Sequence, residues 1–314
     1  MTTLLSHPGT TARPGALRGA AAAPSARAGN RWRIPLRTDA DVECIAAAGV
    51  AVRAALDAAV ARCVPGATTA SLEAAAREAR RAAGADALFL GYPAQDAGCG
   101  PAAPFPAVTC ISVNEELVHG IPGPRRLEDG DVVSIDCGAR VNGWCADAAV
   151  TVVAGRPDAA GAALVAATAR VLEVAIGAMA PGIAWSRIAA AMGRAAFEAG
   201  YDVVTGYLGH GIGRSLHEAP EVPNHVGRML RTRDDFTLLP GMVLAVEPML
   251  VPAAPGVAPR AGVSTRTLAD GWTVVVADGR PSAHVEHTIA VTRSGARVLT
   301  GPHGPAYRAF AAHR

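Results

Sequence analysis

The sequence contains no lysine, so arginine supplies all of its permanently positive side chains. The chain is also rich in alanine, glycine and proline, and we attribute the missing lysine to a compositional bias rather than to chemistry. The formal net charge is only +2 over 314 residues. A balance so close to neutral gives no indication of a dedicated nucleic-acid surface.

Cysteine is also sparse, and its spacing excludes two kinds of site. Six cysteines occur, and none forms the C-x-x-C pair typical of a structural zinc site. The first residues lack the apolar stretch of a secretory signal, so a disulfide framework is not expected either. No apolar run reaches the ~20 residues that a membrane helix needs. We therefore expect a soluble cytoplasmic protein with no membrane partner.

Acidic residues are missing from the first 37 positions, which are rich in alanine, glycine, proline and arginine. This composition is typical of a flexible basic extension, and we expect residues 1–37 to form one. An organellar transit peptide has a similar composition, but a bacterial tail suits the overall bias better. Order is expected to begin at Thr38, an N-cap candidate followed three residues later by Asp41.

Half of the residues are apolar, which is enough for a large buried core. Helical patterns are predicted at about residues 38–63, 71–83, 159–179 and 183–199, and strand patterns follow each pair. A Pro-Gly step divides the helices of both pairs, at Pro65-Gly66 and at Pro181-Gly182. The repetition suggests a duplicated α+β unit with a site where the two halves meet.

A β-hairpin with two carboxylates is the clearest local prediction. Residues 131–138 alternate like a strand, Asn142-Gly143 is a strong hairpin turn, and residues 144–153 form the return strand. A two-residue turn places Asp136 and Asp147 on one face as diagonal neighbours, with backbones ~7 Å apart. Two carboxylates at this spacing repel unless solvent or a cation separates them, and the flanking valines argue against an open strand.

Three more residues of the types that bind metals lie at the ends of apolar segments or inside strand-like or glycine-rich ones. Glu247 follows residues 242–246, Glu286 lies in a strand-like stretch, and His210 lies among glycines. A carboxylate at the end of an apolar strand is costly unless it is paired or ligated. Four carboxylates and one imidazole make an oxygen-rich set that suits two divalent first-row ions.

These motifs, in this order, resemble the type I methionine aminopeptidases. The resemblance runs from about residue 38 to about residue 298. Besides the hairpin it rests on Gly91-Tyr92-Pro93, Val118-His119-Gly120, Gly209-His210-Gly211, Leu216-His217-Glu218, Val246-Glu247-Pro248, Asp270-Gly271-Trp272 and Glu286-His287-Thr288. It implies an α+β pita-bread (creatinase/aminopeptidase-like) fold for residues 38–314, the catalytic domain. Two pseudo-symmetric halves would then enclose a dinuclear metal site.

The resemblance also implies a ligand set for two divalent ions. Asp136 would chelate one ion, Asp147 and Glu286 would bridge both, and His210 and Glu247 would complete the shell of the other. Cobalt, manganese, iron and zinc all fit such a mixed nitrogen and oxygen set.

The same resemblance implies roles in catalysis and substrate binding. A metal-activated hydroxide would attack the first peptide bond while Glu247 shuttles a proton. His217 would stabilise the oxyanion and His119 would contact the scissile amide nitrogen, so both also bind substrate. The walls of the methionine side-chain pocket would come from Tyr92, Cys110 and Trp272.

Several positions depart from the family pattern. Residues 94–109 separate Gly91-Tyr92-Pro93 from Cys110, where the family usually has only a few residues, and this insertion lies beside the expected pocket. Gly138 replaces a usual threonine, Ala148 follows Asp147 where threonine is common, and Leu216 replaces a usual aromatic residue. For the other histidines, among them His284, we expect packing or solvation rather than a role in the site.

The implied activity is removal of the initiator methionine from nascent proteins whose second residue is small. The partners would be nascent polypeptide N-termini, with possible contact to the ribosome through the arginines of residues 1–37. A monomer is expected. Two alternatives stay open: a catalytically impaired binding protein on the same fold, and a specialised second-copy aminopeptidase.

Overall fold

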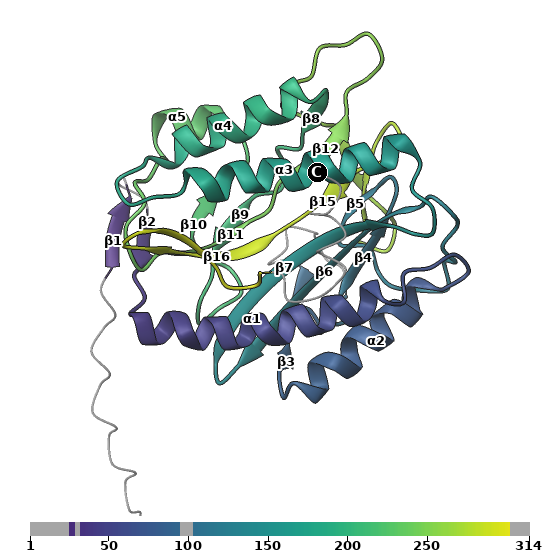
Figure 1. The fold of residues 1–314 in the computed structure, drawn as a ribbon, viewed down its shortest axis with the longest axis horizontal. Coiled ribbons are helices and arrows are strands. Elements are labelled where there is room, and N and C mark those ends of the chain that lie inside the picture. Colours follow the sequence, from purple (N-terminus) through teal and green to yellow (C-terminus); the bar gives the residue numbers. More distant parts are fainter. Residues whose placement is uncertain (1–24, 29–31, 95–102, 302–314) are drawn as a thin grey trace, which may run out of the picture.

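Two pairs of helices enclose the strands of this α+β protein. The structure is a computed structural model that describes residues 25–28, 32–94 and 103–301. In Figure 1 one pair, α1 and α2, runs along the bottom of the molecule, and the other, α3 and α4, runs along the top. The strands lie between the two pairs, so each pair covers a different part of the sheet structure.

The elements have the following bounds. The helices are α1 Asp39–Val60, α2 Thr69–Ala82, α3 Ala159–Ala178, α4 Trp185–Glu198 and the short α5 Arg228–Thr232. The strands of the first half of the chain are β1 Ser25–Ala28, β2 Trp32–Pro35, β3 Asp86–Ala87, β4 Cys110–Val113, β5 Glu116–Val118, β6 Val132–Val141 and β7 Trp144–Val153. The remaining strands are β8 Tyr201–Val203, β9 Gly209–Gly211, β10 Glu218–Val222, β11 Val243–Val246, β12 Met249–Pro252, β13 Thr265–Thr267, β14 Val274–Val276, β15 Ala283–His284, β16 His287–Thr292 and β17 Gly295–Val298.

The hairpin β6–β7 has the register that its turn predicts. Val141 faces Trp144 and Gly138 faces Asp147, as expected for a two-residue turn. Asn142 and Gly143 both have positive φ, at 50° and 78°, which is the backbone geometry of a type I′ turn. Asp136 and Asp147 therefore share one face of the hairpin, because positions two apart along a strand point the same way.

Each half of the chain has its own hydrophobic core. In the first, α1 packs on β6 and β7, and Ile45, Leu56 and Ile135 lie at its centre. In the second, α3 and α4 pack together over the sheet that contains β11 and β16, with Trp185 and Ile289 inside it. The duplicated α+β arrangement predicted from the two Pro-Gly steps is thus present.

The halves join along β7 and the segment that leads into β16. Asp147 and Thr288 are linked twice: the Asp147 amide donates to the Thr288 hydroxyl over 3.0 Å, and that hydroxyl donates to the Asp147 carbonyl over 2.8 Å. The Glu286 amide donates to the Ala149 carbonyl over 3.0 Å. Two of the predicted carboxylates therefore lie directly on the junction of the halves.

Packing at the N-terminal side begins earlier than residue 38, where the sequence suggested that order starts. Ile34 in β2 is only 1% exposed and belongs to the second core. The Arg37 amide donates to the Gly241 carbonyl over 2.7 Å, and its side chain forms an ion pair with Glu218. The composition of residues 1–37 does not predict this packing, because the packing depends on only two residues, Ile34 and Arg37. Residues 1–24 lie outside the described part.

Helix α1 begins where its capping signal predicts. Thr38 and Asp41 form a capping box, in which each side chain accepts a hydrogen bond from the other's backbone amide. Helix α3 is long and apolar enough, by length and composition, to cross a membrane, so the sequence expectation that no segment reaches this length was too strict. Core helices have the same composition, and Leu164, Val171 and Leu172 of α3 are buried in the second core.

Candidate active site

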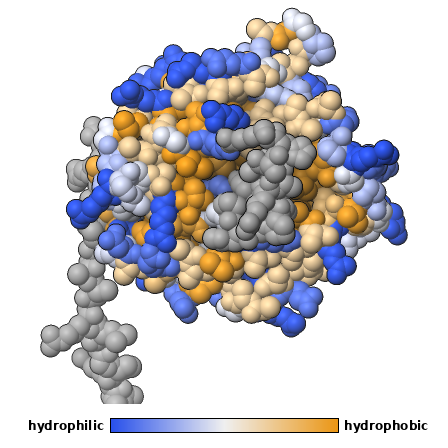
Figure 2. Space-filling view, in the orientation of Figure 1, coloured by the Kyte–Doolittle hydropathy of each residue, from blue (hydrophilic) through white to orange (hydrophobic). Residues whose placement is uncertain are grey.

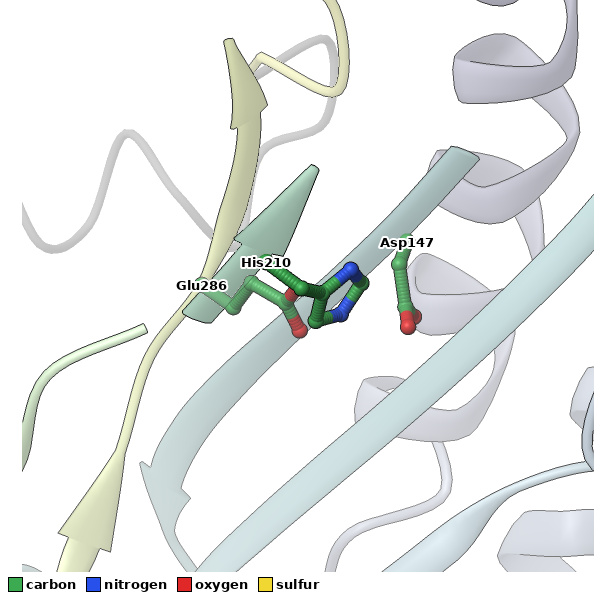
Figure 3. Close-up of side chains that lie close together, drawn as sticks. All are labelled: Asp147, His210 and Glu286. Carbon is green, nitrogen blue, oxygen red and sulfur yellow. The ribbon is translucent and has the colours of Figure 1, made fainter. Parts of the chain in front are cut away.

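Five side chains predicted as metal ligands line one small cavity. They are Asp136, Asp147, His210, Glu247 and Glu286, and the cavity between them measures about 80 Å³. Figure 3 shows Asp147, His210 and Glu286 pointing toward one another. One ligand atom from each of these three lies within 4.8 Å of the other two, a spacing that could hold a metal ion.

The supporting elements explain why these side chains converge. Asp136 and Asp147 come from the paired strands β6 and β7, and His210 comes from β9. Glu247 lies in the gap between β11 and β12, and Glu286 lies in the gap between β15 and β16. A carboxylate at a break between strands can leave the sheet plane, so both glutamates reach the same cavity as the hairpin.

Buried oxygens without partners show that the cavity suits a cation. Asp136 Oδ1, Asp147 Oδ1 and Glu286 Oε1 are buried and accept no hydrogen bond. An uncompensated buried carboxylate is costly, whereas hard divalent ions prefer such oxygens as ligands. The residues present therefore fit a divalent metal.

Burial and mutual repulsion strongly perturb the pKa values of the carboxyl groups. Burial raises the pKa of Asp147 to about 7. Burial, together with the charges of Asp147 and Glu247, raises the pKa of Asp136 well above its usual range. The pKa values of Glu247 and Glu286 are raised in the same direction, first by burial and then by Asp147. These shifts favour protons or cations in the cavity.

His210 is held neutral, as ligation of a metal by an imidazole requires. Burial, aided by the neighbouring His217, lowers the pKa of His210 to about 3. The Nδ1 atom of His210 lies 2.9 Å from the Gly211 carbonyl, which can only accept, so Nδ1 carries the proton. Nε2 is then free to bind a metal and lies 3.8 Å from Glu247 Oε1.

The two predicted catalytic histidines also lie at the cavity. The Nδ1 atom of His217 is 2.6 Å from the Tyr92 hydroxyl, and its ring is perpendicular to that of His210 with centroids 4.3 Å apart. Burial lowers the pKa of His119 to about 4. His119 has a φ of 59°, an unfavourable conformation for a non-glycine residue that the surrounding structure must impose.

An ion pair fixes the loop that carries His217. Glu218 accepts hydrogen bonds from the backbone amides of Arg214 and Ser215, and its other oxygen pairs with Arg37. The Arg37 side chain is 8% exposed and that of Glu218 is 14% exposed. The Arg214 guanidinium lies 3.8 Å from the centroid of the Trp144 ring at the end of the hairpin.

The rest of the small cavity is apolar. The predicted pocket residues Tyr92, Cys110 and Trp272 line it, as expected. Three residues that were not predicted as pocket residues line it as well, namely Phe89, Phe105 and Leu216. Phe105 belongs to the segment 94–109, whose position beside the expected pocket was the only signal for it.

A second, more open cavity of about 430 Å³ adjoins the first and shares Asp136, Glu247 and three histidines with it. Tyr207, Met249 and His284 form part of its wall. His284 was expected to be packed or solvated, and it is buried, but it also borders this cavity. Its Nε2 atom is buried without a hydrogen-bond partner and lies 3.6 Å from Glu247 Oε2. Its place two residues before Glu286, on the same face of an extended segment, was the available signal.

Fold and cavity together define a metallohydrolase, and comparison with known proteins agrees. The model of metallopeptidase family M24 matches residues 43–293, so the chain belongs to this family. A solved structure of a prolidase from Pyrococcus horikoshii has a TM-score of 0.64 at 21% identity, covering 86% of this chain and 64% of that one. At this identity the likeness supports the pita-bread fold alone.

Within the family, the similarity is to methionine aminopeptidases. Methionine aminopeptidase 1 of Mycobacterium tuberculosis is 41% identical over 286 residues, which are 88% of this chain and 98% of the relative. The crystal structure of methionine aminopeptidase from Thermotoga maritima has a TM-score of 0.75 at 36% identity, covering 86% of this chain and all of that one. None of these similarities supports the alternative of an impaired binding protein.

Proposed function

We propose that this chain removes the initiator methionine from nascent polypeptides whose second residue is small. The observation that carries the proposal is a single cavity lined by two unlike sets of side chains. One set is apolar and supplies sulfur and aromatic walls, which suit a thioether side chain. The other set consists of buried carboxylates with oxygens that have no hydrogen-bond partner, which suit divalent ions.

Two divalent ions would be held by the five converging side chains. In this proposal Asp147 and Glu286 would be shared by the two ions, Asp136 would help to hold one, and His210 and Glu247 would help to hold the other. Ions in such a set supply a water that ionises near neutral pH and a Lewis acid for the carbonyl oxygen of the substrate. Manganese, iron, cobalt and zinc all suit this mixture of oxygen and nitrogen ligands.

The chain's own groups supply the proton transfers and the oxyanion contact. Glu247, whose pKa is raised by burial, can take the proton of the attacking water and deliver it to the leaving amide nitrogen. His217, held at Nδ1 by the Tyr92 hydroxyl, can donate a hydrogen bond to the developing oxyanion from its other ring nitrogen. His119 is neutral at pH 7 and its Nδ1 atom has no hydrogen-bond partner, so it can contact the scissile amide.

The arrangement of the two cavities supports recognition of an N-terminal methionine. The small pocket would take the methionine side chain, and the open cavity would take the chain that follows. His119 and His217 line both cavities, so the scissile bond would lie between them. A bulky second side chain would push the carbonyl out of place, and a ~1 Å displacement can cost ~100-fold in rate.

The proposal also covers the location of the protein, its oligomeric state and its partners. We place it in the cytoplasm as a monomer that meets N-termini during synthesis. The arginines of residues 1–37, a range without acidic residues, favour contact with the negatively charged ribosome.

A panel of Met-X-Ser tripeptides tests the substrate choice. We expect efficient release of methionine for X = Gly, Ala and Ser, and a kcat/KM lower by ~100-fold or more for X = Leu and Lys. Equal kcat/KM for alanine and leucine would refute the selectivity and leave the metallopeptidase assignment intact.

A further inference from the structure

We propose that His284 is a positioning residue for Glu247, whose carboxylate it holds through a hydrogen bond from its Nε2–H group to Oε2. This inference rests on the proposed function, because it takes Glu247 as a metal ligand and proton carrier. The Glu247 carboxylate lies between two imidazole rings. Its Oε1 atom is 3.8 Å from Nε2 of His210, and its Oε2 atom is 3.6 Å from Nε2 of His284.

The two imidazoles present opposite kinds of atom to this carboxylate. Nδ1 of His210 donates to the Gly211 carbonyl, so its Nε2 turns a lone pair toward Oε1, and a cation between them relieves the repulsion. Nε2 of His284 is buried, has no hydrogen-bond partner and faces Oε2. A neutral imidazole carries one N–H, and the tautomer with that hydrogen on Nε2 avoids a second repulsion between lone pairs. His284 is therefore the donor to Glu247, and His210 is left for the metal.

The hairpin β6–β7 fixes the backbone from which the His284 ring projects. The His284 amide donates to the hydroxyls of Ser134 and Thr151, over 3.3 and 3.0 Å, and the Thr151 hydroxyl donates to the His284 carbonyl. On its other side His284 pairs with Met249 between strands β15 and β12. The position of the ring is thus set by three strands before any ion binds.

Burial makes this contact important for the orientation of Glu247. The side chain of His284 is 3% exposed and that of Glu247 is 12% exposed, so little water can replace either partner. Figure 2 shows hydrophilic residues mainly around the rim of the molecule and apolar residues toward the middle of this face. A polar nitrogen without a partner inside such a protein is costly and calls for a physical reason.

The separation of 3.6 Å is longer than a hydrogen bond, and metal binding should shorten it. A carboxylate must be ionised to ligate a metal, and an ionised acceptor forms shorter and stronger hydrogen bonds than a neutral one. The only other hydrogen bond given to Glu247 is at its backbone, where the Asn224 side-chain amide donates to its carbonyl over 3.0 Å. Loss of a group that orients a metal ligand typically lowers metal affinity or activity by ~10-fold to ~100-fold.

The test measures Mn²⁺ binding to chelator-treated full-length protein by calorimetry, and kcat and KM for Met-Ala-Ser at saturating Mn²⁺. We expect His284→Leu to weaken the binding step that Glu247→Gln also weakens by ~10-fold to ~100-fold, and to lower kcat with little change in KM. His284→Gln should restore most of both, because its side-chain amide keeps an N–H donor. Val285→Ala is the matched control: Val285 is the next residue and packs into the second core, so this variant should lower Tm without changing Mn²⁺ affinity.

The outcomes separate this inference from the function on which it rests. If Glu247→Gln weakens Mn²⁺ binding but His284→Leu does not, the inference is wrong. It is also wrong if His284→Gln or Val285→Ala weakens binding as much as His284→Leu, since the effect would then be a loss of packing. A third Mn²⁺ that binds wild type and is lost in His284→Leu would overturn it too, because His284 would then be a ligand. If Glu247→Gln leaves Mn²⁺ binding unchanged, or wild type releases no methionine, the proposed function itself fails. Thermal unfolding of each variant shows that the assayed protein is folded.

Discussion

Removal of divalent ions should make the stability of this protein fall as the pH rises from 7 to 8. The carboxyl groups of Asp136, Asp147, Glu247 and Glu286 all have raised pKa values in the folded chain without metal. In the unfolded chain these groups are fully ionised at pH 7. The folded state therefore binds more protons, and the stability this contributes at low pH is lost as the pH rises through the folded pKa values.

The buried histidines of the site act in the opposite direction but in another pH range. Burial lowers the pKa values of His119, His210 and His284, so the unfolded state binds more protons only below its own pKa of about 6.5. Between pH 7 and 8 these histidines are neutral in both states and contribute little. That interval consequently isolates the carboxyl groups.

The size of the effect follows from the number of protons retained. Each carboxyl group that keeps its proton in the folded state contributes a slope of about 1.4 kcal/mol per pH unit. Asp147, with a pKa of about 7, is half titrated at the start of the interval, and its more strongly shifted neighbours retain protons beyond it. The three protons retained by those neighbours give an expected loss of about 4 kcal/mol between pH 7 and 8, and Asp147 adds a smaller share at the lower end of the interval.

Urea unfolding of chelator-treated and Mn²⁺-loaded protein at both pH values measures this loss. The loaded protein should show no comparable slope, because bound metal requires deprotonated ligands. In metal-free protein Asp147→Asn should flatten the slope, while Asp86→Asn, at an exposed position on β3, should leave it unchanged. Equal stability of the metal-free wild type at pH 7 and 8 would refute the reasoning.

Two further predictions concern the loop that carries His217. Replacing His217 by alanine should lower kcat by ~100-fold or more through loss of the oxyanion donor, without changing the bound metal measured by atomic absorption; loss of metal would mean that the role is wrong. Replacing Arg37 by alanine should lower the free energy of unfolding, measured in urea, by about 2 kcal/mol. This loss is smaller than for a fully buried ion pair, because the Glu218 side chain is 14% exposed. A chain that begins at Ser25 should have the same free energy of unfolding as the wild type. A chain that begins at Thr38 should lose at least as much free energy of unfolding as Arg37→Ala does. Equal stability of the two shortened chains would contradict the role given to Arg37.

Short-range signals predicted the fold where a local rule determines the geometry. The Asn142-Gly143 turn fixed the register of β6 and β7, and with it the shared face of Asp136 and Asp147. The Thr38 capping box placed the start of α1 correctly. The helical period of the apolar residues and the Pro-Gly steps predicted the four long helices of the described residues to within a few residues.

Features that depend on long-range contacts were not accessible to such rules. The packing of residues 32–37 depends on Gly241 and Glu218, which are distant in the sequence. Phe105 reaches the pocket because its backbone pairs with Tyr92, which no local pattern in a Pro-rich segment predicts. Glu247 and Glu286 point into one cavity because each lies in a gap between two strands. The positions of these gaps depend on sheet geometry and not on composition.

Release of free methionine from Met-Ala-Ser is the measurement that tests the central claim most directly. The protein is loaded separately with manganese, iron, cobalt or zinc, and wild type is compared with Asp147→Asn and Glu286→Gln. We expect wild type to release methionine with at least one of these ions and both variants to lose the activity, because each lacks a carboxylate that would hold the ions. A wild-type protein that binds these ions yet releases no methionine from Met-Ala-Ser would contradict the account.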